Sequence, residues 1–507
     1  NLESNLEYDY KIEGYSCGFE APYVELSVTT SKLDFNLLPI EVIGNIEDLF
    51  AANLADFNND GRVDIFISAL LKNGHVVFSI YEQKSDGSYL EHQITRNSLR
   101  EEVVVVVTDY NNDGLMDLAQ LQGSLELFLN KGDFNLELME AESIGFPGSN
   151  GIGFFDINND LKLEYPTPKV SEWKWLYYDI LKPQSEPIFI QKVMATTQQL
   201  NKPAENVELI DVNRDGKKDF LFVYYDRLVL LTNTNSGYDE STYFKIGEGG
   251  ILDVISGDFN SGNEFQILVQ GTNESQFSLA VCTMADGQLK EQLVLTENLV
   301  GNPLVADFNN DGLSDIVYNE YVLNGTSIVG KRTIIAYSEK DSNSYTFQRL
   351  PDYGVDLLAL ADKDNDGDLD ILVSQYHSSL RYTTMNWLDN YLDELDMTKL
   401  NSSPSKVKNL TLSPNHALNT VRIQWESAED NESESNKLHY EISIKDSEGN
   451  YLIAPWSTAN GLRLTTERRN FVSTLETTIN CIPNGVYTVS VQAIDNGFRA
   501  SELDYTA

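Results

Sequence analysis

A nine-residue pattern of oxygen-bearing side chains begins at Asp56. Positions 1, 3, 5 and 9 of the pattern carry carboxylate or amide oxygens and position 6 is a glycine, as seen in Asp56, Asn58, Asp60, Gly61 and Asp64. Side chains at this spacing, with a glycine for the tight turn and a backbone carbonyl at position 7, surround a hard cation with oxygen ligands. We therefore interpret residues 56–64 as a calcium-binding loop.

The same spacing recurs along the chain, with first positions 47 to 55 residues apart. Four further copies keep the pattern, with candidate ligands Asp109, Asn111, Asp113 and Asp117; Asp211, Asn213, Asp215 and Asp219; Asp307, Asn309, Asp311 and Asp315; and Asp362, Asp364, Asp366 and Asp370. Self-similarity at such a period is typical of a repeat architecture.

Two copies depart from the pattern. The third has Asp156, Asn158, Asp160 and Glu164, with Leu161 in the glycine position. The fifth keeps Asp258 and Asn260 but has Gly262, Asn263 and Gln266 in the remaining places. The sequence therefore predicts five Ca²⁺ sites, a sixth and weaker site in the third copy, and no ion in the fifth.

The flanks of these loops are rich in β-branched and aromatic residues, which favour strands rather than the helices of an EF-hand. A repeat of about 50 residues accommodates four short strands, the content of one propeller blade. Between the first two loops we expect strands at 64–70, 75–81, 89–95 and 102–109. Each loop would join the innermost strand of a blade to the next strand, so the seven copies predict an all-β, seven-bladed β-propeller. A β-solenoid is the alternative, but its repeats are usually shorter.

These loops resemble the FG-GAP or VCBS repeats of integrin α-subunit heads and of many bacterial secreted proteins. The resemblance covers roughly residues 33–390 and implies a propeller fold that binds calcium. It implies no particular function, because propellers host both enzymes and binding proteins.

The propeller is expected to span residues 33–395, after an N-terminal extension at 1–32 that we do not place. The segment 32–40 resembles the outer strands before the second and third loops, so we expect it to complete the seventh blade and close the ring.

After a linker at 396–406, residues 407–507 show the alternating strands of a β-sandwich. Residues 482–493 resemble the last strands of fibronectin type III domains, which puts Tyr487 at a tyrosine corner and Trp425 in the core.

Composition narrows the classes of partner. The net charge of −42, from 78 acidic and 36 basic residues, argues against nucleic acid and anionic membrane surfaces as direct partners. The three cysteines lie in three different regions and form no disulfide framework. The sequence contains no run of 18 apolar residues, so we expect no membrane span. Loops of this simple kind suit the millimolar calcium outside cells. We therefore expect an extracellular or cell-surface protein, and an export signal already removed would explain Asn1.

Catalytic constellations are not evident. The five histidines make no zinc-binding spacing, and neither a nucleophile elbow nor a phosphate loop is present. The far ends of the second strands instead carry candidate ligand-binding residues, namely Arg227, Tyr318, Tyr376, His377 and Arg381, with Trp173 and Trp175 as an outlying aromatic pair. The alternative is that these are ordinary strand-end aromatics, and that the tryptophans lie between neighbouring blades.

The sequence thus favours a non-catalytic recognition or adhesion module that binds a protein or a glycan at the cell surface. A subunit of a larger surface or outer-membrane assembly remains an alternative, as does a polysaccharide lyase or hydrolase on a propeller scaffold.

Overall fold

The computed structural model describes the following parts of the chain: residues 7–12, 15–16, 19–20, 24–29, 35–40, 46–94, 104–122, 124–140, 164–169, 174–181, 188–196, 206–234, 237–245, 249–260, 265–273, 276–285, 288–324, 327–340, 344–351, 353–378, 382–390, 400–466, 471–480 and 482–506. These residues form strands, turns and loops and include no helix. Accordingly, none of these parts contains a helix able to cross a membrane.

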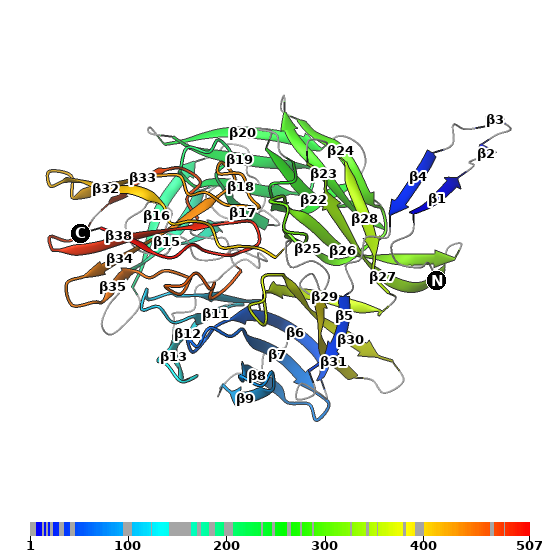
Figure 1. Cartoon of the computed structure of the whole chain (residues 1–507), viewed down its shortest axis with the longest axis horizontal. Helices are drawn as coiled ribbons and strands as arrows, with labels where there is room; N and C mark the ends of the chain where they lie inside the picture. Colours follow the sequence, from blue (N-terminus) through cyan, green and yellow to red (C-terminus); the bar gives the residue numbers. More distant parts are fainter. Residues whose placement is uncertain are drawn as a thin grey trace.

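Successive antiparallel sheets follow one another along the chain (Figure 1). The first two are β6(Ile46–Ala55), β7(Asp64–Leu71), β8(Val76–Gln83), β9(Tyr89–Gln93), and β10(Val104–Thr108), β11(Asp117–Gln122), β12(Ser124–Asn130), β13(Leu136–Glu140). The third comprises β14(Glu164–Lys169), β15(Lys174–Leu181) and β16(Ile188–Thr196).

The next two sheets are β17(Asn206–Ile210), β18(Asp219–Tyr224), β19(Arg227–Thr234), β20(Gly237–Lys245), and β21(Gly250–Ser256), β22(Gln266–Asn273), β23(Gln276–Ala285), β24(Gln288–Thr296). They are followed by β25(Leu299–Ala306), β26(Asp315–Asn324), β27(Ser327–Ser338), β28(Tyr345–Arg349), and by β29(Val355–Ala361), β30(Asp370–His377), β31(Tyr382–Asn390). Neighbouring sheets join at two points, where β20 pairs with β24 and β31 pairs with β6 through single short ladders.

In the described residues, the oxygen-rich patterns that begin at residues 56, 109, 211, 307 and 362 each connect the first and second strands of one sheet, as the sequence predicts. We number these segments loop one (56–64), loop two (109–117), loop three (156–164), loop four (211–219), loop five (258–266), loop six (307–315) and loop seven (362–370). In loops one, two, four, six and seven, position 1 follows the last residue of the first strand and position 9 begins the second strand, as with Ala55 and Asp64. The strands expected between loops one and two are confirmed to within a few residues at their ends.

The N-terminal closing strand is also confirmed. β5(Phe35–Pro39) pairs antiparallel with β31 at the edge of the sheet that contains loop seven, with Leu37 opposite Leu388. Ile40 continues the pairing through an N–H donated to the Met385 carbonyl at 3.0 Å. The sheet thus takes its last strand from the opposite end of the chain, which covers an edge that would otherwise be unpaired.

Apolar side chains fill the spaces between neighbouring sheets. One core joins the sheets of loops six and seven around Phe308 and Leu388, and another joins the first two sheets around Phe66 and Phe128. The first strands β6, β10, β17, β21, β25 and β29 line a cavity of about 510 Å³, to which residues of the C-terminal connections also contribute. This radial arrangement of sheets around a cavity is that of a β-propeller.

The C-terminal residues form two further antiparallel sheets. One is β32(Lys408–Asn415), β33(Thr420–Glu426), β36(Glu476–Asn480), and the other is β35(Tyr451–Ile453), β34(His439–Asp446), β37(Tyr487–Ile494), β38(Asp504–Thr506). Their facing side chains share a core that includes Trp425, which is 5% exposed, while Tyr487 packs at its border.

Before the repeats, β1(Glu7–Ile12) pairs with β4(Val24–Thr29), and β2(Tyr15–Ser16) with β3(Phe19–Glu20). Loop three, apart from the backbone of Glu164, lies outside the described residues, so the predicted weak site there stays a prediction.

Candidate functional site

Each complete loop that the structure describes folds around the carboxylate at its first position. In loop one, Asp56 Oδ1 accepts the N–H of Asp60 at 3.1 Å and Oδ2 accepts the N–H of Gly61 at 2.7 Å. The same pair of bonds recurs in loops two, four, six and seven at 2.7–3.2 Å. The turn requires positive φ at Asn59 (58°) and Gly61 (82°), which asparagine and glycine tolerate best.

The carboxylate at position 9 fastens each of these loops to the third strand of its sheet. Asp64 Oδ2 accepts the N–H of Phe57 at 3.0 Å, and Oδ1 accepts the N–H of Gln83 at 2.9 Å. Asp117, Asp219, Asp315 and Asp370 make the equivalent pairs of bonds. Position 9 therefore has a structural role in addition to the metal role predicted for it, and each oxygen keeps a second lone pair for a ligand.

Burial raises the pKa of these position-9 carboxyl groups. The pKa is raised to about 8 in Asp64 and Asp370 and to about 6 in Asp219, mainly by loss of solvent. In Asp117 and Asp315 burial again comes first, and the charges of Asp109 and Asp307 raise the pKa further. Buried carboxylates are ionised at neutral pH only when positive charge compensates them, so these loops provide the electrostatic setting for a cation.

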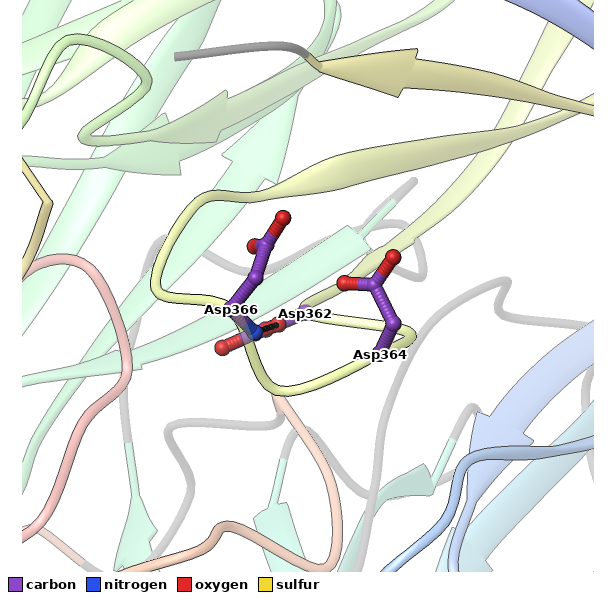
Figure 2. Close-up of side chains that lie close together, drawn as sticks. All are labelled: Asp362, Asp364 and Asp366. Atoms are coloured by element: carbon purple, nitrogen blue, oxygen red, sulfur yellow. Dashed lines mark hydrogen bonds between the residues drawn. The ribbon is translucent and has the colours of Figure 1, made fainter. Parts of the chain in front are cut away.

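Loop seven gathers the most carboxylates. One ligand oxygen from each of Asp362, Asp364 and Asp366 lies within 4.8 Å of the others, and Figure 2 shows the three side chains around the bend of the loop. Ligand oxygens at 2.3–2.6 Å from a Ca²⁺ ion stand at comparable mutual distances. The donor set is hard oxygen and mostly charged, so the residues present fit calcium.

Protein cations also reach loop seven. Arg499 donates from Nη2 to Asp362 Oδ2 at 2.8 Å, and Lys363 lies 3.5 Å from Asp370 and forms an ion pair with Asp389. Part of the negative charge of this loop is therefore compensated by the chain itself.

Position 4 links loops to one another, a role that the sequence analysis did not assign. Its asparagine donates from Nδ2 to the glycine carbonyl of the next loop: Asn59 to Gly114 at 2.8 Å, Asn310 to Gly367 at 3.0 Å and Asn365 to Gly61 at 2.8 Å. The last of these bonds joins loop seven to loop one across the closure of the ring. The sequence offered one sign of this role, because asparagine recurs at position 4, to which the calcium pattern assigns no ligand. Asn112 and Asn159 also occupy this position.

The C-terminal sheets dock on the face of the propeller that carries the loops. Residues 427–438, 454–466, 471–475 and 495–503, which lie between their strands, include contacts with these loops, and Figure 1 shows the two sheets beside the propeller. The N–H of Asp56 donates to the Leu464 carbonyl at 2.9 Å, and Asn496 Nδ2 donates to the Gly312 carbonyl at 3.0 Å.

Apolar contacts strengthen this docking. Trp456, only 2% exposed, and Leu464 enter the core of the first two sheets, while Phe498 enters the core between the sheets of loops six and seven. Asn401, from the segment that was predicted to be a linker, donates its N–H to the Gly367 carbonyl at 3.1 Å. The chain itself therefore covers part of the loop face.

The far ends of the second strands lie about 20 Å from the loops, given the rise of 3.3 Å per residue along a strand. The structure contradicts one of the candidates expected there. Tyr318 is 1% exposed, packs in a core with Leu279 and Ile316, and donates its hydroxyl to the Leu295 carbonyl at 3.4 Å. It is a core residue and is removed from the ligand candidates.

Tyr376 and His377 do lie together at the far end. Tyr376 is 55% exposed, and the His377 ring tilts against Tyr382 with centroids 4.8 Å apart. The Lys72 ammonium lies 4.6 Å from the centre of the same Tyr382 ring. We call these three residues, together with the adjacent Tyr376, the far-end cluster; Tyr376 and His377 are consecutive in β30, so their side chains lie on opposite faces of the sheet. Tyr382 and Lys72 were not among the predicted residues.

The remaining candidates are dispersed. Arg227 pairs with the neighbouring Asp226 at 3.0 Å and lies over the Tyr224 ring, in a different sheet from the far-end cluster. Trp173 and Arg381 fall outside the described residues, and the side chain of Trp175 is likewise not described.

Fold and loops together define an all-β protein of the propeller class. The family model of the FG-GAP-like repeat matches residues 56–120, which contain loops one and two and the strands between them. This segment is thus similar to FG-GAP-like repeats, as predicted. No curated protein matched the sequence.

Solved structures with related folds share little sequence with this chain. A lectin from Agrocybe aegerita, described as recognising non-reducing terminal N-acetylglucosamine, has 10% identity and a TM-score of 0.42 over 65% of this chain and 85% of its own. The exotype rhamnogalacturonan lyase YesX has 12% identity and a TM-score of 0.42, and the match covers 74% of this chain and 79% of the lyase chain. The Cps50 (Swd1) β-propeller domain of Myceliophteria thermophila has 11% identity and a TM-score of 0.38, and the match covers 68% of this chain and 99% of that domain. Similarity at this level carries no argument about what this chain binds or catalyses.

Proposed function

We propose that this chain is a calcium-stabilised, non-catalytic recognition or adhesion module that acts outside the cell. It consists of a seven-bladed propeller, closed by β5, and a fibronectin type III-like sandwich docked on the loop face. Support for seven blades comes from the seven loops and from the order of the sheets around the cavity. Support for the sandwich comes from its sheets of three and four antiparallel strands over one core.

Calcium would be held by the oxygen side chains at positions 1, 3 and 5, with position 9 bracing the loop. The ion would supply the positive charge that the buried carboxylates need, and the chain would fold the loop and join it to its neighbours through position 4. Extracellular calcium concentrations suit loops of this kind, which supports the proposed location.

The observation that carries the proposed function is the contrast between the two ends of the propeller. The loop end is partly covered by the C-terminal connections, whereas the far-end cluster presents Tyr376 with its side chain half exposed. Aromatic rings beside a lysine can stack on a sugar ring and attract an acidic group. A glycan or a surface protein, either free or within an outer-membrane assembly, is the partner that this chemistry fits.

Binding to a glycan array and to extracellular proteins tests the proposal. The double substitution Tyr376→Ala and His377→Ala should weaken binding at least tenfold without changing the melting temperature. Tyr505→Ala is the matched control, because this tyrosine is 53% exposed but lies on β38 of the C-terminal sheets. Unchanged binding in the double variant would place the ligand elsewhere.

An assay of polysaccharide turnover tests the enzyme alternative. A polysaccharide lyase would release products whose unsaturated ends absorb ultraviolet light, and the double variant would abolish that release. Observation of such turnover by the wild-type chain would overturn the non-catalytic proposal.

A further inference from the structure

Loop five differs from the complete loops in its donor set. Among the side-chain ligand positions 1, 3, 5 and 9, Asp258 is the one carboxylate, since Gly262 and Gln266 replace the acids at positions 5 and 9. Gln266 is 4% exposed, and its Oε1 atom has no hydrogen-bond partner in the described part of the chain. One charged ligand is a poor match for Ca²⁺, which prefers several carboxylates, so the residues of loop five do not fit the metal.

A lysine from the C-terminal sheets lies at this loop instead. Lys437, two residues before β34, places Nζ 3.0 Å from Asp258 Oδ1 and 3.2 Å from the Asn260 carbonyl. Its side chain is 3% exposed. A lysine is almost never buried to this extent unless its charge is paired, and here the ammonium group meets the side chain of position 1 and the backbone of position 3.

A second cation reaches the same carboxylate. Arg214, at position 4 of loop four, donates from Nη2 to Asp258 Oδ1 at 3.0 Å. Its counterparts in loops one, six and seven are asparagines that reach a glycine carbonyl in the next loop. Burial alone raises the pKa of Asp258, but the charges of Lys437, His439 and Arg214 outweigh that effect, and the pKa is lowered.

We infer that the ammonium group of Lys437 occupies the cation position of loop five in place of a metal ion. The ammonium is a compact charge with three donors, so it can satisfy a carboxylate and a carbonyl together, as a hard cation would. Because this cation belongs to the C-terminal sheets, the sheet of loop five is joined to them by a contact that is independent of the calcium concentration.

Acetylation of the wild-type chain gives a first test that needs no variant. With an N-hydroxysuccinimide ester in calcium buffer, Lys437 should react at least tenfold more slowly than Lys408, whose side chain is 53% exposed. Mass spectrometry of the peptides measures both rates. Equal rates for the two lysines would overturn the inference.

Conversion of loop five into a metal site gives the second test. The substitutions Gly262→Asp and Gln266→Asp restore the missing acids, and they should add one bound Ca²⁺ per chain only when combined with Lys437→Met. Elemental analysis after gel filtration measures the metal content. The same gain with Lys437 intact, or no gain in a folded triple variant, would overturn the inference.

This second test rests on the proposed calcium binding of the other loops. A wild-type chain without bound calcium would refute that part of the proposed function, while the acetylation rates would still decide the role of Lys437.

Discussion

Gly312, at position 6 of loop six, lies close to the backbone of the C-terminal connection at 427–438. A β-carbon added there would stand 2.4 Å from the Glu432 carbonyl oxygen and 2.9 Å from Ser433 Cα. Both are backbone atoms, so Gly312→Ala forces the connection at 427–438 to move by about 1 Å to reach an ordinary contact. We expect such overpacking to cost about 1–3 kcal/mol.

Two glycines at the same position serve as matched controls. Gly61 and Gly114 have φ of 82° and 90°, close to the 86° of Gly312, so all three alanine variants share the cost of about 1–2 kcal/mol for a β-carbon in the left-handed region. At Gly61 the nearest atom to the added carbon is 3.4 Å away, and at Gly114 it is 3.7 Å away. These contacts are near normal, so the controls lack the clash.

Urea unfolding at saturating calcium, followed by tryptophan fluorescence, compares the three variants. Gly312→Ala should lose about 1–3 kcal/mol more free energy of unfolding than either control, because only this variant disturbs docking. If the three variants lose the same free energy within about 0.5 kcal/mol, the C-terminal sheets do not press on loop six as the structure shows.

Other expectations concern metal, loop linkage, closure and docking. Chelation should lower the melting temperature, because an ion bound only to the folded chain stabilises it by mass action, and an unchanged melting curve after complete metal removal would contradict this. Asn365→Ala removes the bond to the Gly61 carbonyl across the closure and should cost about 1 kcal/mol in urea unfolding; no loss would show that the bond contributes nothing. Deletion of residues 1–42 removes β5 and exposes the edge of β31, so light scattering should show association; a monomer that melts like the full chain would place the closure elsewhere. Trp456→Ala, at a side chain 2% exposed, should cost about 3–5 kcal/mol and speed proteolysis between the propeller and the C-terminal sheets, whereas wild-type resistance would contradict tight docking.

The sequence predicts what depends on local spacing. Ligand spacing and the bounds of the loops are local properties, so the turns at Asp56 and its equivalents follow the prediction. The closing strand was also predictable, because residues 35–39 match other outer strands in pattern.

Burial at strand ends and docking were not predictable in the same way. Alternation shows which residues share a strand face, but in a propeller both faces of a sheet pack against neighbours, and Tyr318 is buried for that reason. The contacts of Leu464 and Asn496 with the loops depend on the shapes of two surfaces that are far apart in the sequence. The spacing of apolar residues in the sequence does not indicate whether two such surfaces fit together.

The pairing of β5 with β31 also constrains the order of events during synthesis. The two strands are about 350 residues apart, so a ribosome that adds about 5–20 residues per second needs about 20–70 s to deliver the second after the first. Throughout that interval the ring is an open arc with two unsatisfied ends, and contacts of such long range form late. The C-terminal sheets emerge last of all. The nascent chain therefore passes through a prolonged stage in which both the unclosed edge and the uncovered loops are open to chaperones, to proteases and to other copies of the same chain.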